Sequence, residues 1–208
     1  MGGGSRWTPG GAELDAQQAV ASVANALEKL VARNDGLGVA VTVGEEERKG
    51  RGLTAFVGPR RPGISIKKYL ERIHSYVLCS PASLVAGFVY VDRAAHRSPE
   101  FLVGSLNVHR LILTGVMVAS KFFDVMPQSN AFYAKVGGVS NAELNKLELE
   151  LLFLLDFRIN MSSHEFESYL SHLEKEMTAS LNSKITTNIQ GVGDDFIAQR
   201  KVHNIHWK

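Results

Sequence analysis

The sequence has little cysteine, little net charge and no long apolar run, and each shortage argues against a class of protein. A single cysteine, Cys79, cannot form an internal disulfide, so we expect a reducing compartment. With 23 basic and 21 acidic residues, the formal charge of +2 is too small to indicate a nucleic-acid-binding surface. The apolar run LILTGVMVAS is shorter than the ~20 residues that a membrane span requires. We therefore expect an intracellular protein, in the nucleus and/or the cytoplasm, that binds neither nucleic acid nor a membrane.

The composition divides the 208 residues into three parts. Residues 1–63 hold most of the 19 glycines and the charged run EEERKGRG, which predicts a flexible segment with one amphipathic helix at about 13–33 of uncertain docking. Residues 64–177 show sustained apolar periodicity and form the predicted folded domain. Residues 178–208 are polar and aperiodic, so we expect a loose C-terminal tail.

Helical patterns fill the predicted domain without a strand pattern between them, which indicates an all-α fold. Ser80 followed by Pro81 predicts a helix start, and the pairs Ser140 with Glu143 and Ser162 with Glu165 each predict a capping box. The expected helices cover about 66–77, 82–95, 106–125, 130–136, 140–155 and 162–177. The helix at 106–125 is apolar on nearly all sides and should lie at the centre.

Two charges lie in otherwise apolar helices, Lys121 in VMVASKFFDV and Glu148 in KLELELLF. Burying either charge alone costs several kcal/mol, so such charges are normally paired or lie at the edge of a contact surface. One interpretation is an internal salt bridge between them, and the other is that both lie at the rim of the bundle and contact a partner. Helical periodicity does not choose between these interpretations.

Several segments in order resemble the cyclin box: ISIKKYLERI, VYVDR, NVHRLILTGVMVASKF, NAFYAKVGGVSNAELNKLELELLF and LDFRIN. The match is closest to the P-type or U-type cyclins of plants and to the phosphate-regulatory cyclin of yeast. The resemblance implies a single five-helix cyclin box with flanking helices and flexible termini. It also implies a regulatory subunit that binds and activates a cyclin-dependent protein kinase, in cell-cycle or phosphate signalling. A cyclin-fold adaptor that binds another protein without activating a kinase is the alternative.

In cyclins generally, a lysine late in the third box helix and a glutamate in the fifth hold the kinase near its αC helix, and these positions match Lys121 and Glu148. Apolar burial must add to two such charged contacts, although each candidate residue is more often part of a core. The apolar candidates are Phe122, Phe123, Leu144, Leu151 and Leu152. Arg72 and Asp92 match charged positions of the family, and we expect them to form a structural bridge between the first two box helices, the alternative being two exposed side chains.

Other patterns argue against an enzyme. No nucleophile–base pair or carboxylate cluster occurs at motif spacing, so we expect no catalytic residue and no small-molecule substrate. The seven histidines, His109 among them, have no metal-ligand spacing, and we expect neither a metal nor a cofactor. The substrate-docking patch of the mitotic cyclins has no counterpart in ISIKKYLERI, so docking of short Arg-x-Leu motifs is not transferred to this chain.

Overall fold

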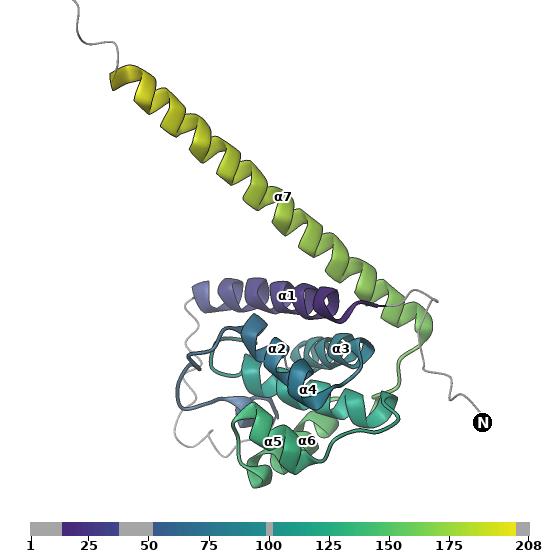
Figure 1. Cartoon of the computed structure of the whole chain (residues 1–208). Coiled ribbons are helices and arrows are strands. Elements are labelled where there is room, and N and C mark those ends of the chain that lie inside the picture. The colour runs from purple at the N-terminus through teal and green to yellow at the C-terminus, as the bar shows by residue number, and fades with distance from the viewer. Residues whose placement is uncertain (1–13, 38–51, 99–101, 203–208) are drawn as a thin grey trace, which may run out of the picture.

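The described residues of the computed structural model form an all-helical bundle, which confirms the predicted fold class (Figure 1). The structure describes residues 14–37, 52–98 and 102–202, with side chains as far as 182. Its elements are α1 (Ala16–Gly36), the short 3₁₀ helix η3 (Gly52–Phe56), α2 (Ile66–Val77), α3 (Pro81–Arg97), α4 (Val108–Phe123), α5 (Asn130–Gly137), α6 (Asn141–Leu154) and α7 (Ser163–Val202).

Local signals in the sequence set most of the helix starts. Four helices begin with a serine whose hydroxyl accepts a hydrogen bond from the backbone N–H three residues on: Ser65, Ser80, Ser129 and Ser140. The capping box predicted at Ser140 is half formed, because Oε1 of Glu143 accepts a hydrogen bond from Nε of Arg110 at 2.7 Å. The hydroxyl of Ser162 also accepts from the backbone N–H of Glu165, as predicted.

Helix α4 is the centre of the bundle, as its apolar sequence predicted. Its closest neighbour is α3, and two glycines allow the two backbones to approach. A Cβ atom added to Gly115 would lie 2.7 Å from the carbonyl oxygen of Gly87. A Cβ atom on Gly87 would lie 2.7 Å from the backbone nitrogen of Val116. Neither glycine can be replaced without moving a helix backbone.

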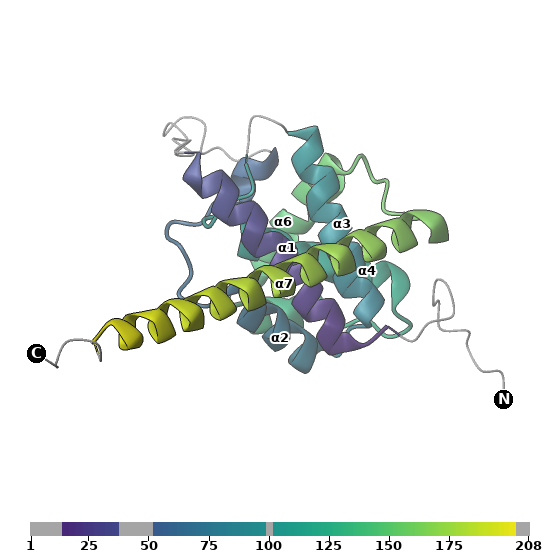
Figure 2. The same ribbon diagram turned by 90° about the horizontal axis from the view of Figure 1, so that it is seen from above.

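Helix α1 is the amphipathic helix predicted at about 13–33, and it is docked on the bundle. The prediction of flexibility is wrong for 52–63, and its remaining parts, 1–13 and 38–51, lie outside the described residues. One face of α1 packs against α2 and α3, and α7 crosses over it, as two views show (Figures 1 and 2). Val23 and Leu27 of α1 are fully buried, and so are Leu53 and Phe56 of η3. The side chains of α1 thus close the core over α2 and α3, and those of η3 lie against α6 and α4.

Helix α7 continues well past the predicted end at Met177. Its first four turns are anchored, since Phe166 and Leu173 are buried and Glu176 accepts a hydrogen bond from Lys29 of α1 at 2.8 Å. The helix then runs on to Val202 beyond the bundle (Figure 1). A loose tail from residue 178 was therefore the wrong prediction for the backbone up to 202, because extending a nucleated helix costs much less than starting one.

The contact between α3 and α4 leads to a stability prediction. We expect Gly115→Ala to lower the free energy of unfolding by about 1–3 kcal/mol, because the new methyl group forces the two backbones apart. Gly36→Ala is the matched control, since a Cβ atom there meets nothing within 4 Å. Chemical denaturation of both variants measures the difference, and equal stabilities would contradict the proposed close contact.

Candidate functional site

The two charges that the sequence singled out meet at the surface between α4 and α6. Nζ of Lys121 donates a hydrogen bond to Oε1 of Glu148 at 2.6 Å. The lysine side chain is 33% exposed and the glutamate side chain is 18% exposed. The pair is therefore bonded internally and is also open to a partner. The internal salt bridge of the first interpretation is therefore formed, and contact of the pair with a partner stays a prediction.

A third residue fixes the carboxylate of this pair. Nδ2 of Asn130, the first residue of α5, donates to Oε2 of Glu148 at 2.7 Å and to Oδ1 of Asn145 at 2.7 Å. Both oxygens of Glu148 thus have a donor, and the carboxylate is held in one orientation. Sequence analysis missed Asn130, because a polar residue at the start of a helix has no unusual pattern. We call Lys121, Glu148 and Asn130 the charged cluster.

The structure divides the five predicted apolar contact residues into two groups. Leu144 and Leu151 are fully buried in the core, so the prediction that they contact a partner is wrong. Both leucine side chains point from α6 into the core, where they have no exposed surface for a partner to contact. Phe122 is exposed, while Phe123 and Leu152 are partly buried against the core. These three side chains lie next to Lys121 or Glu148 in the helices and stay available at the surface.

Sequence analysis missed an exposed apolar face on α6. Leu149 and Phe153 lie one turn apart, and Phe157 follows the helix; all three are exposed. The rings of Phe153 and Phe157 pack edge to face with 5.3 Å between their centroids. With Leu152 these residues form what we call the α6 apolar face. The apolar residues of this face are visible in KLELELLF and LDF, but the sequence does not show which of the leucines point inward.

The backbone after α6 adopts a sparsely populated conformation. Asp156 and Phe157 have φ angles of 54° and 55°, in the left-handed region that residues with a side chain rarely occupy. The N–H of Phe157 donates to the carbonyl oxygen of Leu152 at 2.9 Å, which closes the turn. This turn holds the ring of Phe157 against Phe153 and extends the α6 apolar face beyond the helix.

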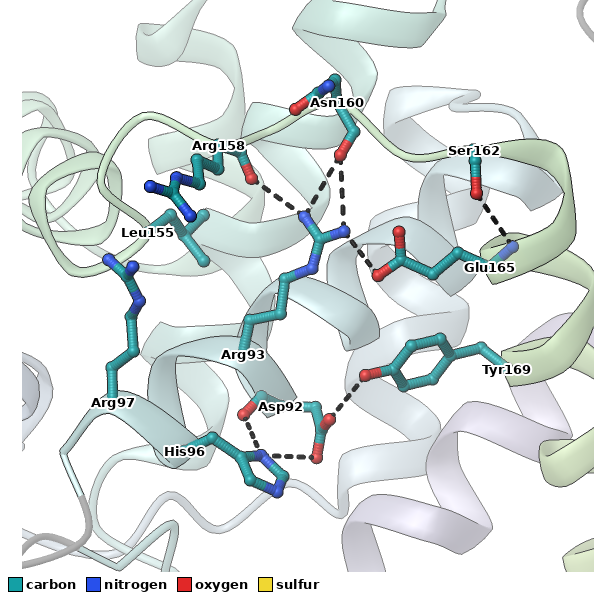
Figure 3. Close-up of a pocket in the computed structure, with 10 residues that line it drawn as sticks. All are labelled: Asp92, Arg93, His96, Arg97, Leu155, Arg158, Asn160, Ser162, Glu165 and Tyr169. Atoms are coloured by element: carbon teal, nitrogen blue, oxygen red, sulfur yellow. Dashed lines mark hydrogen bonds and ion pairs between the residues drawn. The ribbon is translucent and has the colours of Figure 1, made fainter.

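The predicted bridge between Arg72 and Asp92 is not formed. Oδ2 of Asp92 accepts a hydrogen bond from the hydroxyl of Tyr169 at 2.8 Å, and the His96 ring lies 3.5 Å from Oδ1 (Figure 3). Asp92 therefore joins α3 to α7, whereas Arg72 is exposed on α2. Burial, together with the hydrogen bond to Asp92, raises the pKa of the Tyr169 hydroxyl, so it remains a donor at neutral pH.

The remaining titratable candidates have structural surroundings. Nε2 of His109 lies 2.9 Å from the carbonyl oxygen of Ile64, and burial lowers the pKa of the ring. Within the part of the chain that the structure describes, no three His, Cys, Asp or Glu side chains are grouped as metal ligands. Over the same residues, we find no helix with the length and apolar content of a membrane span.

The charged cluster and the exposed α6 apolar face are thus carried by one all-helical bundle. Comparison with known proteins then identifies the family. Residues 17–159 match the family model described as Cyclin, which is more than half of the 208 residues. The chain belongs to the cyclin family, whose members are regulatory proteins. The match begins within α1 and ends just after the left-handed turn.

Plant cyclins are among the most similar proteins. The chain is 57% identical over 155 residues to Cyclin-U1-1 of Arabidopsis thaliana, which covers 74% of this chain and 71% of the relative. It is 49% identical over 158 residues to Cyclin-P1-1 of Oryza sativa subsp. japonica, covering 74% of this chain and 60% of the relative. Identity to Cyclin-U4-1 of Arabidopsis thaliana is 44% over 159 residues, or 76% of each chain. The predicted resemblance to P-type and U-type cyclins is thereby confirmed.

The surroundings of Cys79 lead to a prediction about its reactivity. Burial, together with the nearby charge of Asp124, raises the pKa of this thiol to about 12. At pH 8 the side chain is then almost entirely the unreactive neutral thiol, and it is also shielded from reagent. We expect a disulfide reagent such as DTNB to modify the folded chain at least tenfold more slowly than the chain in guanidinium chloride. Equal rates in both solutions would contradict this environment.

Proposed function

We propose that this cyclin binds and activates a cyclin-dependent protein kinase. The observation that carries the proposal is the accessible ion pair of Lys121 with Glu148, oriented by Asn130 and placed beside the α6 apolar face. A cation, an anion and exposed aromatic rings on one surface suit a helix that offers both backbone polar groups and apolar side chains. The αC helix of a kinase is such an element, and its position controls activity.

Activation requires the cyclin to prefer one kinase conformation over the other. Moving a kinase from mostly inactive to mostly active takes ~5.5 kcal/mol of differential affinity. Two charge-assisted hydrogen bonds supply about 1.5–3 kcal/mol each. Burying Phe153, Phe157 and Leu149 adds roughly 1.5–3 kcal/mol for each side chain that becomes fully buried. These contacts count toward the required preference only as far as they are made with one position of the αC helix.

The charged cluster is preorganised for this task. Because Asn130 and Lys121 both donate to Glu148, the carboxylate needs no reorientation when the partner arrives. Lys121 has three donors, and one of them is used internally, so the others remain for carbonyl oxygens of a partner. The partner thus adds hydrogen bonds without breaking the existing pair.

A cyclin-fold adaptor is the second candidate, and the strength of the internal pair favours it. Lys121 and Glu148 already pair at 2.6 Å, so a protein held by the α6 apolar face alone needs no contact with either charge. The two candidates share one surface and differ in its charge requirement. For the kinase-binding role we propose cell-cycle or phosphate signalling, inside the cell in the nucleus, the cytoplasm or both.

Charge changes at the pair distinguish the two roles. We expect Lys121→Glu to weaken capture of a cyclin-dependent kinase about 100-fold, because it removes a donor to the partner and repels Glu148. Lys67→Glu, at an exposed position on α2, is the matched control and should bind normally. Co-purification with a panel of plant kinases, together with phosphorylation of a histone substrate, measures binding and activation. Circular dichroism checks the fold.

A double charge swap tests whether the partner reads the sign of each charge. The variant Lys121→Glu with Glu148→Lys can re-form the internal ion pair with opposite polarity. If the kinase contacts these charges, capture stays lost in the swapped chain even though its stability returns. If the swapped chain regains both its stability and its capture of the kinase, the pair is only structural. If the kinase is captured normally but is not activated, the adaptor role is favoured.

The α6 apolar face gives an independent prediction. We expect Phe153→Ser to reduce kinase affinity at least tenfold, since it removes an aromatic anchor and the edge contact with Phe157. Tyr76→Ser on α2 is the matched control, because Tyr76 is 65% exposed and Phe153 is 66% exposed. Isothermal titration with the captured kinase compares them, and equal losses in both variants would argue against a specific role for this face.

A further inference from the structure

A second surface feature lies on the side of α6 where the chain passes to α7. An open cleft of about 690 Å³ separates the end of α3 from the start of α7 (Figure 3). Three arginines line it, Arg93, Arg97 and Arg158, and they come from α3 and from the connection between α6 and α7. The proposed kinase-binding surface uses none of them, so the cleft needs its own explanation.

The inner wall of the cleft is fixed by hydrogen bonds, and its one cation, Arg93, lies with two carboxylates, Glu165 and Asp92, the second of which accepts from the hydroxyl of Tyr169. Nη1 of Arg93 donates to the carbonyl oxygen of Arg158 at 2.9 Å, and Nη2 donates to Oε1 of Glu165 at 2.6 Å. The carbonyl oxygen of Asn160 accepts a further bond from the same guanidinium. Arg93 is thus fully engaged and ties the chain after α6 to α3. Arg93 therefore holds the wall in place, and both of its terminal nitrogens are already bonded to the protein.

The mouth of the cleft has an excess of positive charge. Nη2 of Arg97 and Nε of Arg158 lie 3.7 Å and 3.4 Å from the same oxygen, Oδ2 of Asp156. These distances exceed the 2.7–2.9 Å of a charge-assisted hydrogen bond. Two guanidinium groups therefore share one exposed carboxylate, and Nη1 of Arg97 also donates to the carbonyl oxygen of Leu154 at 3.2 Å. These three side chains alone carry one more positive charge than negative charge. Among the described residues, the terminal nitrogens of Arg158 also have no hydrogen-bond partner.

We propose that this mouth binds a phosphate monoester carried by a segment of a partner protein. A guanidinium fork matches two phosphate oxygens, and a phosphate group has enough oxygens for both arginines, whereas a carboxylate has only two. A phosphorylated side chain carries about −1.5 to −2 charges at pH 7, which neutralises the excess at Arg97 and Arg158. The site takes phosphoserine or phosphothreonine as its ligand.

The border of the cleft favours a polypeptide over a free phosphate ion. Arg158 follows Phe157 directly in the chain, so the exposed rings of Phe157 and Phe153 begin one residue away from the mouth, although neither ring lines the cleft. Side chains that flank a phosphorylated residue can pack on these rings, and a free ion cannot use them. The cleft is also much larger than one phosphate group. The site goes beyond the proposed kinase binding and does not require it.

Peptide binding by the purified full chain, with no kinase present, tests this proposal. The probe is a fluorescent degenerate peptide mixture with a central phosphoserine, compared with the same mixture carrying serine. We expect anisotropy to show at least tenfold tighter binding of the phosphorylated mixture. The double variant Arg97→Ala with Arg158→Ala should lose this preference, and Arg158→Lys should lose part of it, since it keeps the charge and removes the fork.

Two controls make the result decisive. Arg72→Ala removes an exposed arginine of α2 and should bind the phosphorylated mixture as the unchanged chain does, and thermal melting should show each variant folded. Equal binding of both mixtures, or retained binding by the double variant, would overturn the proposal. Inorganic phosphate should compete only at far higher concentration; competition at equal concentration would overturn the polypeptide ligand in favour of a free anion.

Discussion

The close approach of α3 and α4 at Gly87 and Gly115 is the constraint on which the rest of the structure depends. It places α4 so deep that its residues from Leu111 to Ala119 have almost no exposed surface. Its first turn, at His109 and Arg110, and its last turn reach solvent, and Lys121 lies on the last turn. An ammonium group is tolerated in this helix because the helix ends where the core ends. The position of the functional cation thus follows from the packing of two glycines.

Helix α6 completes the site because its two sides have different tasks. Leu144, Leu147 and Leu151 recur at helical spacing and fill the space against the core, so the stripe beside them must face outward. Glu148 lies on the boundary between these sides. A carboxylate at this boundary is partly desolvated, so its bond to Lys121 is stronger than a surface ion pair, and it stays within reach of a second polypeptide. A deeper position would bury the Glu148 carboxylate away from a partner, and a fully exposed position would weaken its bond to Lys121.

Features that depend on a few neighbouring residues were predictable from the sequence. Serine caps gave the helix starts, and Lys121 and Glu148 were evident because a charge in an apolar stripe needs a partner. Features that depend on which elements meet were not predictable. The sequence shows that Asp92 carries a charge, but the approach of α7 decides that Tyr169, and not Arg72, is its partner.

The same reason explains the errors at the site itself. Leu149 and Leu151 lie on nearly opposite sides of α6, about 200° apart at ~100° per residue. The leucines of KLELELLF occur on most sides of the helix, so periodicity does not fix which side faces the core. Asn130 was missed because its role comes from lying beside Glu148 in space, 18 residues further along the chain. The docking of α1 was left open because its amphipathic pattern shows that one side is apolar and says nothing about what covers it.

The left-handed turn at Asp156 and Phe157 links the two surfaces of this protein. Such a turn in residues with side chains costs about 1–3 kcal/mol for each one, so the surrounding structure must hold it. It is held on one side by the bond from Phe157 to Leu152 and on the other by Arg93, which binds the carbonyl oxygen of Arg158. In return, consecutive residues point to different places: Phe157 extends the α6 apolar face, and Arg158 reaches the cleft. Relaxing the turn to a common conformation would remove the aromatic ring from one surface and the cation from the other at the same time. The strain is therefore the cost of placing the α6 apolar face and the proposed anion-binding mouth on one short connection.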